Sequence, residues 1–206
     1  MVRLLDSATV DLLSILAVAA GYLIGSIDFG VIVPRLQGVD IYRLGSGNPG
    51  TSNVLRSLGR KSAALVLLGD LLKGLVAAMI GDLVGTDAVG FAAGFAAVAG
   101  HCFPLWHRFK GGKGVAAAGG MLLWMEPLFG LLMIALWGGL VALTKRASIA
   151  PLALAVVCVP GLMAFGYRGW SLVWAGAAAL LVLGRHWKNI RRLASGGEHT
   201  IGEKAA

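Results

Sequence analysis

Apolar residues along the chain gather into long runs that are separated by short polar stretches. The runs cover residues 10–33, 62–80, 86–105, 114–126, 128–143, 149–166 and 170–184. A helix that crosses a bilayer needs about 20 apolar residues, so the first three runs are long enough, the last two slightly short, and the fourth and fifth clearly short. Glu126 and Pro127 interrupt the stretch from Gly114 to Leu143, and a charge beside a helix breaker indicates a hairpin tip. The pattern predicts an all-α integral membrane protein with seven transmembrane segments.

The composition of the chain also favours a membrane protein. Of the 206 residues, 57% are hydrophobic and only 14% are charged, whereas a soluble domain carries about 25% charged residues. We interpret residues 1–206 as one polytopic membrane domain with a polar tail, 194–206. The first apolar run has acidic residues ahead of it rather than a basic flank, which argues against a cleaved signal peptide. Cys102 and Cys158 lie in or beside apolar runs and are expected to be reduced and buried.

Basic residues mark one side of the expected bundle. With seven segments, most Lys and Arg side chains fall after the first, third, fifth and seventh segments, and acidic residues dominate the opposite loops. Because positive loops stay in the cytoplasm, we expect the N-terminus outside and the C-terminus inside. This arrangement explains the net charge of +8 without a nucleic-acid partner, since the chain has no basic arm.

The polar stretches with motif-like composition all fall on the expected cytoplasmic face. They are "GSIDFG" (25–30), "GSGNPGTSNVLR" (45–56), "GHCFPLWHRFKGGKG" (100–114), "TKRAS" (144–148) and "GRHWKNIRRL" (184–193). In the second stretch, glycines and short polar side chains followed by Arg56 could bind an anion. An ordinary turn with Thr51 or Ser52 as a helix cap explains the same residues. The residues alone leave both interpretations open.

The stretch "FKGGKG" is not a nucleotide-binding P-loop. His107 stands where that motif needs glycine, and Gly114 follows Lys113 where it needs a hydroxyl for Mg²⁺. Two interpretations remain, a positively charged flank of a membrane segment or a glycine-lined cradle for a phosphate. Lys113 is the stronger candidate for phosphate, and Lys110 is better explained as a flank.

Further polar residues lie at or inside the apolar runs. His186 and Asn189 are spaced i, i+3 and share a helical face, which is also explained by a basic cap on the last helix. Asp70 and Lys73 have the same spacing inside an apolar run, and we expect a structural ion pair because isolated charges there are costly. The chain lacks a His-x4-Asp motif, an HExxH motif and a carboxylate cluster for metal, so we expect neither thiol nor metal catalysis.

In order and spacing, the polar stretches resemble one family, the bacterial acyl-phosphate:glycerol-3-phosphate acyltransferases (PlsY). The likeness rests on "GSIDFG", "GSGNPGTSNVLR", "DLLKG", "GHCFPLWHRFKGGKGVA" and "RHWKNIRRL", and it extends from Gly21 to about Glu198. It implies a seven-span protein of the bacterial inner membrane whose active site faces the cytoplasm. It also implies transfer of an acyl group from acyl phosphate to the 1-hydroxyl of glycerol 3-phosphate, giving lysophosphatidate and phosphate.

The resemblance also implies site residues and partners. The implied catalytic residues are Ser46, Lys113, His186 and Asn189. The implied substrate- and phosphate-binding residues are Arg56, Gly47, Asn48, Asn53, Gly111, Gly112, Gly114, Ser26 and His101. No cofactor or metal is expected, and the expected partners are the two substrates, membrane lipid and an acyl-phosphate synthase. Direct attack on the acyl carbonyl is our mechanistic hypothesis, with either the departing phosphate or His186 as the base.

Three stretches depart from the family pattern. Asp28 stands where the family usually has proline, and a carboxylate there would repel a phosphate unless it is neutral, paired or turned away. "GTSN" replaces Gly-Ala-Thr-Asn, and "TKRAS" differs from the family's Thr-Arg-Tyr-Ser-like stretch, so Lys145 and Arg146 receive no role. A small transporter or flippase for a phosphorylated metabolite or lipid is the alternative function, although such proteins usually place their sites near the bilayer midplane.

Overall fold

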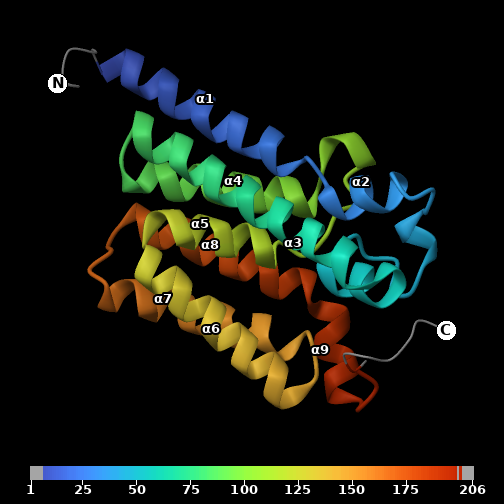
Figure 1. The fold of residues 1–206 in the computed structure, drawn as a ribbon. Helices are drawn as coiled ribbons and strands as arrows, with labels where there is room; N and C mark the ends of the chain where they lie inside the picture. Colours follow the sequence, from blue (N-terminus) through green and yellow to red (C-terminus); the bar gives the residue numbers. More distant parts are fainter. Residues whose placement is uncertain (1–6, 199, 201–206) are drawn as a thin grey trace.

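The computed structural model describes residues 7–198 and 200, and every regular element in this part of the chain is helical. The longer helices are α1 (Ser7–Gly25), α3 (Thr51–Val84), α4 (Asp87–Cys102), α5 (Val115–Met125), α6 (Pro127–Thr144), α7 (Ile149–Ala164) and α8 (Trp170–Arg185). Two short α-helices, α2 (Phe29–Arg35) and α9 (Trp187–Ala194), and two 3₁₀ turns, η1 (Ile41–Arg43) and η2 (Leu105–His107), lie between or after them. Figure 1 shows the longer helices side by side in one bundle.

Helices α3, α4 and α5 form the middle of the bundle. Helix α3 contacts α1, α2, α4 and α5, and α4 continues the packing to α8, against which α7 lies. Small residues allow these backbones to approach closely, as is usual between membrane helices. At Gly74 an added Cβ would overlap the backbone of Ala117, and at Gly120 it would overlap the backbone of Leu71. These glycines bring α5 against α3 and so fix the position of the loop that precedes α5.

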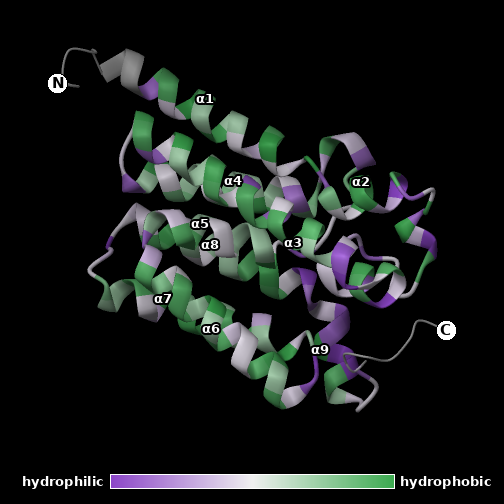
Figure 2. Ribbon diagram, viewed as in Figure 1, coloured by the Kyte–Doolittle hydropathy of each residue, from purple (hydrophilic) through white to green (hydrophobic). Residues whose placement is uncertain are grey.

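Within the part of the chain that the structure describes, four segments are long and apolar enough to cross a membrane, namely Asp11–Arg35, Thr51–Val84, Asp87–His107 and Pro127–Thr144. Helices α5, α7 and α8 are apolar but shorter. Figure 2 shows hydrophobic residues over most of the long helices and hydrophilic residues gathered at the end of the bundle where α2 and α9 lie. Large apolar side chains such as Leu16, Leu131 and Leu180 are exposed on the outside. An exterior of this kind matches a lipid environment.

The helix boundaries differ from the sequence pattern at three places. The first apolar run, 10–33, is interrupted, because α1 ends at Gly25 and α2 begins at Phe29. The polar stretch 45–56 is partly helical, since α3 begins at Thr51, with Gly50 rather than Thr51 or Ser52 as its N-cap. A kink at Gly59, whose φ is 82°, divides α3 into two parts. This φ lies in the left-handed region that glycine adopts without strain.

Candidate active site

A cavity of about 260 Å³ runs from the polar end of the bundle into its apolar interior. On α8 its lining includes Ala175, Ala178, Val182 and, just after the helix, His186. This spacing keeps the four residues on one helical face. The helical rise of about 1.5 Å per residue makes the row about 16 Å long. The cavity therefore joins a polar rim at His186 to an apolar channel along α8.

Most of the site residues that the sequence predicts meet at this cavity. Its lining includes Ser46, Asn48, Asn53, Arg56, His101, Lys113, Gly114, His186 and Asn189. Gly47, Gly111 and Gly112 belong to the two loops that supply this lining but are not themselves part of it. Ser26 is also outside the lining, and its hydroxyl donates a hydrogen bond of 2.9 Å to the carbonyl of Tyr22. The structure thus shows a local contact for Ser26 at the end of α1 and places it outside the cavity lining.

Asn53 shapes the loop that precedes α3. Its Oδ1 accepts a hydrogen bond of 3.0 Å from the backbone N–H of Ser46, and its Nδ2 donates one of 2.9 Å to the carbonyl of Leu44. Gly47 has a φ of 66°, which the turn requires. Because Asn53 and Arg56 are spaced i, i+3 on the first turns of α3, the guanidinium follows the loop directly. The amide of Asn53 therefore fixes the loop, and Ser46 and Arg56 are left to face the cavity.

The glycine loop before α5 packs tightly against His101. The N–H of Gly112 donates a hydrogen bond of 3.0 Å to the carbonyl of His101. An added Cβ at Gly111 would overlap the backbone of His101, and one at Gly112 would overlap its imidazole ring. Gly114 has a φ of 84° and is the N-cap of α5. The first N–H groups of α5 have no acceptor within the helix, so this end can bind an anion.

A chain of hydrogen bonds connects Lys113 to Glu198, in the segment that follows α9. Lys113 Nζ donates to Asn189 Oδ1 at 2.5 Å, and Asn189 Nδ2 donates to Glu198 Oε1 at 2.7 Å. Glu198 also accepts hydrogen bonds from Ser148 Oγ at 2.7 Å and Arg192 Nε at 2.9 Å. Residues 199 and 201–206 of the expected polar tail lie outside the described residues. Within the described part of the tail, Glu198 is buried and lines the cavity. Sequence spacing gave no signal for the contacts of Glu198 with Asn189 and Ser148, because they join residues outside any one helix.

Burial sets the protonation of the two basic groups at the rim. It lowers the pKa of Lys113 to about 8, and nearby Arg192, Arg56 and Arg185 add to this effect while Glu198 opposes it. Burial, followed by the charge of Lys113, lowers the pKa of His186 to about 4. His186 Nδ1 lies 2.7 Å from the carbonyl of Val182, which can only accept, so Nδ1 carries the proton. Near neutral pH, His186 is therefore neutral, with Nε2 as an acceptor.

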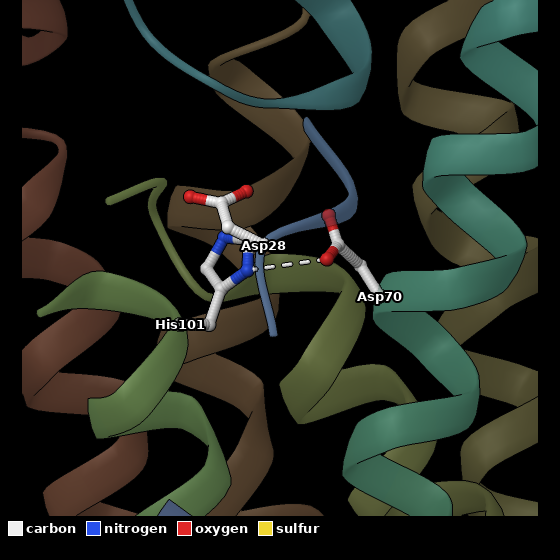
Figure 3. Close-up of side chains that lie close together, drawn as sticks. All are labelled: Asp28, Asp70 and His101. Carbon is white, nitrogen blue, oxygen red and sulfur yellow. Dashed lines mark ion pairs between the residues drawn. The ribbon is translucent and has the colours of Figure 1, made fainter. Parts of the chain in front are cut away.

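Beneath the glycine loop, a buried ion-pair network links three elements of the bundle. Lys73 Nζ lies 2.8 Å from Asp70 Oδ1, which confirms the expected pair. It also lies 2.8 Å from His101 Nδ1 and donates a hydrogen bond of 2.9 Å to the carbonyl of Ile27. The Nδ1 of His101 is 3.4 Å from Asp70 Oδ1, and Figure 3 marks this pair with a dashed line. This network fixes His101, and His101 in turn supports the glycine loop.

Asp28 completes this buried cluster without entering the cavity. One ligand atom each from Asp28, Asp70 and His101 lie within 4.8 Å of one another, a spacing that could hold a metal ion. The ammonium of Lys73 already contacts both Asp70 and His101, so the positive charge there comes from the chain itself. Asp28 is fully buried and is not among the residues that line the cavity. Of the three ways in which Asp28 could avoid repelling a phosphate, the structure shows that it is turned away.

Comparisons with known proteins agree with this geometry. Residues 15–196 match the family model described as glycerol-3-phosphate acyltransferase. The chain belongs to the glycerol-3-phosphate acyltransferase family. A relative of that name from Hyphomonas neptunium is 48% identical over 195 residues, covering 92% of this chain and 93% of its own. Another from Sinorhizobium fredii is 45% identical over 192 residues, covering 93% and 94%.

The fold matches two crystal structures of PlsY (YgiH), described as an integral membrane glycerol 3-phosphate acyltransferase. The glycerol 3-phosphate form is 37% identical, with a TM-score of 0.88 and coverage of 92% of this chain and 96% of that one. The lysophosphatidic acid form is 38% identical, with a TM-score of 0.85 and coverage of 92% and 95%. Membership of this family makes the chain a multi-pass integral membrane protein and an acyltransferase, and it decides against the transporter alternative.

Proposed function

We propose that this acyltransferase uses acyl phosphate as its donor and acylates the 1-hydroxyl of glycerol 3-phosphate, releasing lysophosphatidate and inorganic phosphate. Glycerol 3-phosphate as acceptor is supported by the family and by the ligand-bound forms of the related structures. The cavity supplies the main structural support, because one end offers cationic groups and the other an apolar channel. Two phosphate-bearing substrates, one with an alkyl chain, need both features in one space.

The residues of the rim suit a direct transfer. Arg56, Lys113 and the first N–H groups of α5 would neutralise and orient the substrate phosphates. The hydroxyl oxygen of glycerol 3-phosphate would attack the acyl carbonyl, and the bond between that carbon and the phosphate oxygen would break. Ser46 and Asn189 would orient the reacting groups. Acyl phosphate already carries a good leaving group, so the transfer needs no covalent enzyme intermediate.

The departing phosphate is the better candidate for the base. His186 has a free acceptor nitrogen, but its pKa of about 4 makes it a weak base near neutral pH. A phosphate released next to the attacking hydroxyl can accept the proton as the carbon–oxygen bond breaks. In this proposal His186 accepts a hydrogen bond from substrate and helps to orient it.

The proposed setting is the bacterial inner membrane. Seven crossings, by α1 together with α2, then α3, α4, α5, α6, α7 and α8, would place the N-terminus outside and the cavity's polar rim on the cytoplasmic side. The distribution of basic residues supports this orientation. Glycerol 3-phosphate would then enter from the cytosol, and a synthase on the same side would be the partner that supplies acyl phosphate.

The donor can be tested with the purified protein in lipid nanodiscs. Acyl phosphate and glycerol 3-phosphate should give equal amounts of phosphate and lysophosphatidate, and acyl-CoA in place of acyl phosphate should give no product. Use of acyl-CoA at a comparable rate would contradict the proposed donor. Absence of lysophosphatidate with every donor would contradict the proposed reaction as a whole.

A further inference from the structure

Arg185, the last residue of α8, donates hydrogen bonds to two carbonyls of the glycine loop. Its Nε donates a hydrogen bond of 3.0 Å to the carbonyl of Gly112, and its Nη2 donates one of 2.8 Å to the carbonyl of Gly111. The guanidinium also lies over the ring of Phe103, at 5.1 Å from the ring centroid. Arg185 is not among the described residues that line the cavity. It therefore acts on the loop from outside the space that the substrates would occupy.

Because the peptide bond is planar, the hydrogen bonds from Arg185 to these two carbonyls also fix the direction of two N–H groups. In a trans peptide the C=O and the N–H of the same unit point in opposite directions. With the Gly111 carbonyl turned to Arg185, the N–H of Gly112 points the other way and donates to the carbonyl of His101. With the Gly112 carbonyl held in the same way, the N–H of Lys113 also points away from Arg185. Lys113 and Gly114, which follow, both line the cavity.

We propose that Arg185 is a positioning residue for the acyl transfer, because its guanidinium fixes the glycine loop so that Lys113 and the start of α5 face a substrate phosphate. This inference rests on the proposed function. His101 supports the loop on the opposite side, so the two residues hold it between them. Only a planar fork with donors at fixed separation can hold two successive carbonyls, and a lysine at this position cannot reproduce it.

Arg185 also contributes to the charge around Lys113. The charged groups that act on Lys113 are Glu198, Arg192, Arg56 and Arg185. Glu198 raises the pKa of Lys113, and the three arginines lower it. Loss of the positive charge at Arg185 should therefore raise the pKa of Lys113. Replacement of the guanidinium by another charged group, which loses the paired hydrogen bonds but keeps the charge, should not. These two effects can be separated by choosing the replacement.

The test compares R185K, which keeps the charge, and R185Q, which does not, with the matched control R191Q. Arg191 lies on α9 over the exposed ring of Trp187, at 5.6 Å, and is not among the cavity-lining residues. The kcat of each variant and its KM for both phosphate-bearing substrates are measured from pH 6.5 to 9.5 in nanodiscs, together with the unfolding temperature. F103L is added as a milder variant that removes the ring beneath Arg185 but leaves its donors.

In both Arg185 variants we expect the KM of the substrate whose phosphate binds at the loop to rise about tenfold, since hydrogen bonds from a charged donor are lost. The fall in kcat should be smaller. Substrate binding should weaken at alkaline pH as Lys113 loses its charge, and this weakening should move to higher pH in R185Q but not in R185K. F103L should raise the same KM by a smaller factor, and it carries the test if R185Q does not fold.

Two results would overturn the role of Arg185. One is KM values in the Arg185 variants that match those of R191Q, and the other is a loss of kcat with KM unchanged. Activity of the natural protein is measured alongside. If that activity is absent, the proposed function fails. If it is present and the variants behave like R191Q, only the role of Arg185 fails.

Discussion

Lys113 combines two properties at the level of a single side chain. It is held by Asn189 in the polar rim, and burial among other cations brings its pKa down to about 8. A lysine is charged below its pKa, so its attraction for phosphate is complete at lower pH and declines as the pH rises through that value. The charge of this one residue is therefore sensitive to pH in the range where enzymes are assayed.

We predict that the KM for glycerol 3-phosphate rises as the pH increases above about 8, because Lys113 then loses its charge. In K113R the rise should be absent, since arginine stays charged throughout this range, although the KM should be higher at every pH. Initial rates measured from pH 6.5 to 9.5 in nanodiscs test this, with spontaneous hydrolysis of acyl phosphate subtracted. The same rise of KM at alkaline pH in K113R would show that a group other than Lys113 is responsible.

His186 allows a second prediction at the residue scale. Loss of a true general base costs about 10²-fold or more in rate. Because the pKa of His186 is lowered to about 4, we expect H186A to reduce kcat by less than this factor. Single-turnover rates with saturating substrates provide the measurement, and R191Q serves as the control. Complete loss of activity in folded H186A would instead make His186 the base.

At the scale of elements, α5 and the loop before it form the most constrained part of the site. Arg185 and His101 hold the loop, and the buried pair of Asp70 and Lys73 holds His101. Helices α3, α4 and α8 thus all contribute to the position of one glycine loop. Any side chain added inside this arrangement must displace one of its supports.

We predict that G112A loses at least about tenfold in kcat/KM, because the new methyl group would overlap the ring of His101 and the loop must move away from it. The matched control is G138A in α6, where an added Cβ meets nothing within 4 Å. Alanine should favour that helix slightly over glycine, so G138A should keep full activity. Equal activity of the two variants would contradict a rigid loop.

Some of these elements could be predicted from sequence, and the reasons are local. Glu126 next to Pro127 marked the break between α5 and α6, because both residues act on the helix they occupy. The ion pair of Asp70 with Lys73 followed from i, i+3 spacing within one helix. The break between α1 and α2 falls within the polar stretch "GSIDFG". The single run 10–33 passes over it because apolar residues continue on both sides.

Contacts between distant segments could not be predicted in the same way. The carboxylate of Glu198 reaches Ser148 and Asn189, and Arg185 reaches the glycine loop, only after the bundle has formed. The apolar runs and the placement of basic residues between them predicted that the polar stretches gather at one end, and the resemblance to a family named most of the cavity residues. Neither could show which of these residues touch substrate and which hold other residues in place.

At the scale of the whole molecule, the orientation of the bundle determines how the substrates arrive. We predict that a cysteine placed at Arg168 or Glu126 reacts with a membrane-impermeant maleimide in intact cells, and that one at Lys188 reacts only after the inner membrane is opened. The natural Cys102 and Cys158 are buried, so the unsubstituted chain is the control. Labelling of Lys188→Cys in intact cells would reverse the proposed orientation. Failure to label Glu126→Cys would show that α5 and α6 do not cross.

Helix α6 leaves one side of the cavity thinly covered. It packs against α5 and α7, and only 17% of its apolar stretch, Pro127–Thr144, is buried within the protein. Its Met133, Ile134 and Trp137 nevertheless line the cavity. In a bilayer, lipid chains lie on the other side of this single helix. A donor dissolved among those chains has a concentration set by its mole fraction in the membrane rather than by the volume of the assay. Its kinetic constant is therefore a surface quantity, and extra lipid or detergent at a fixed amount of donor dilutes the substrate.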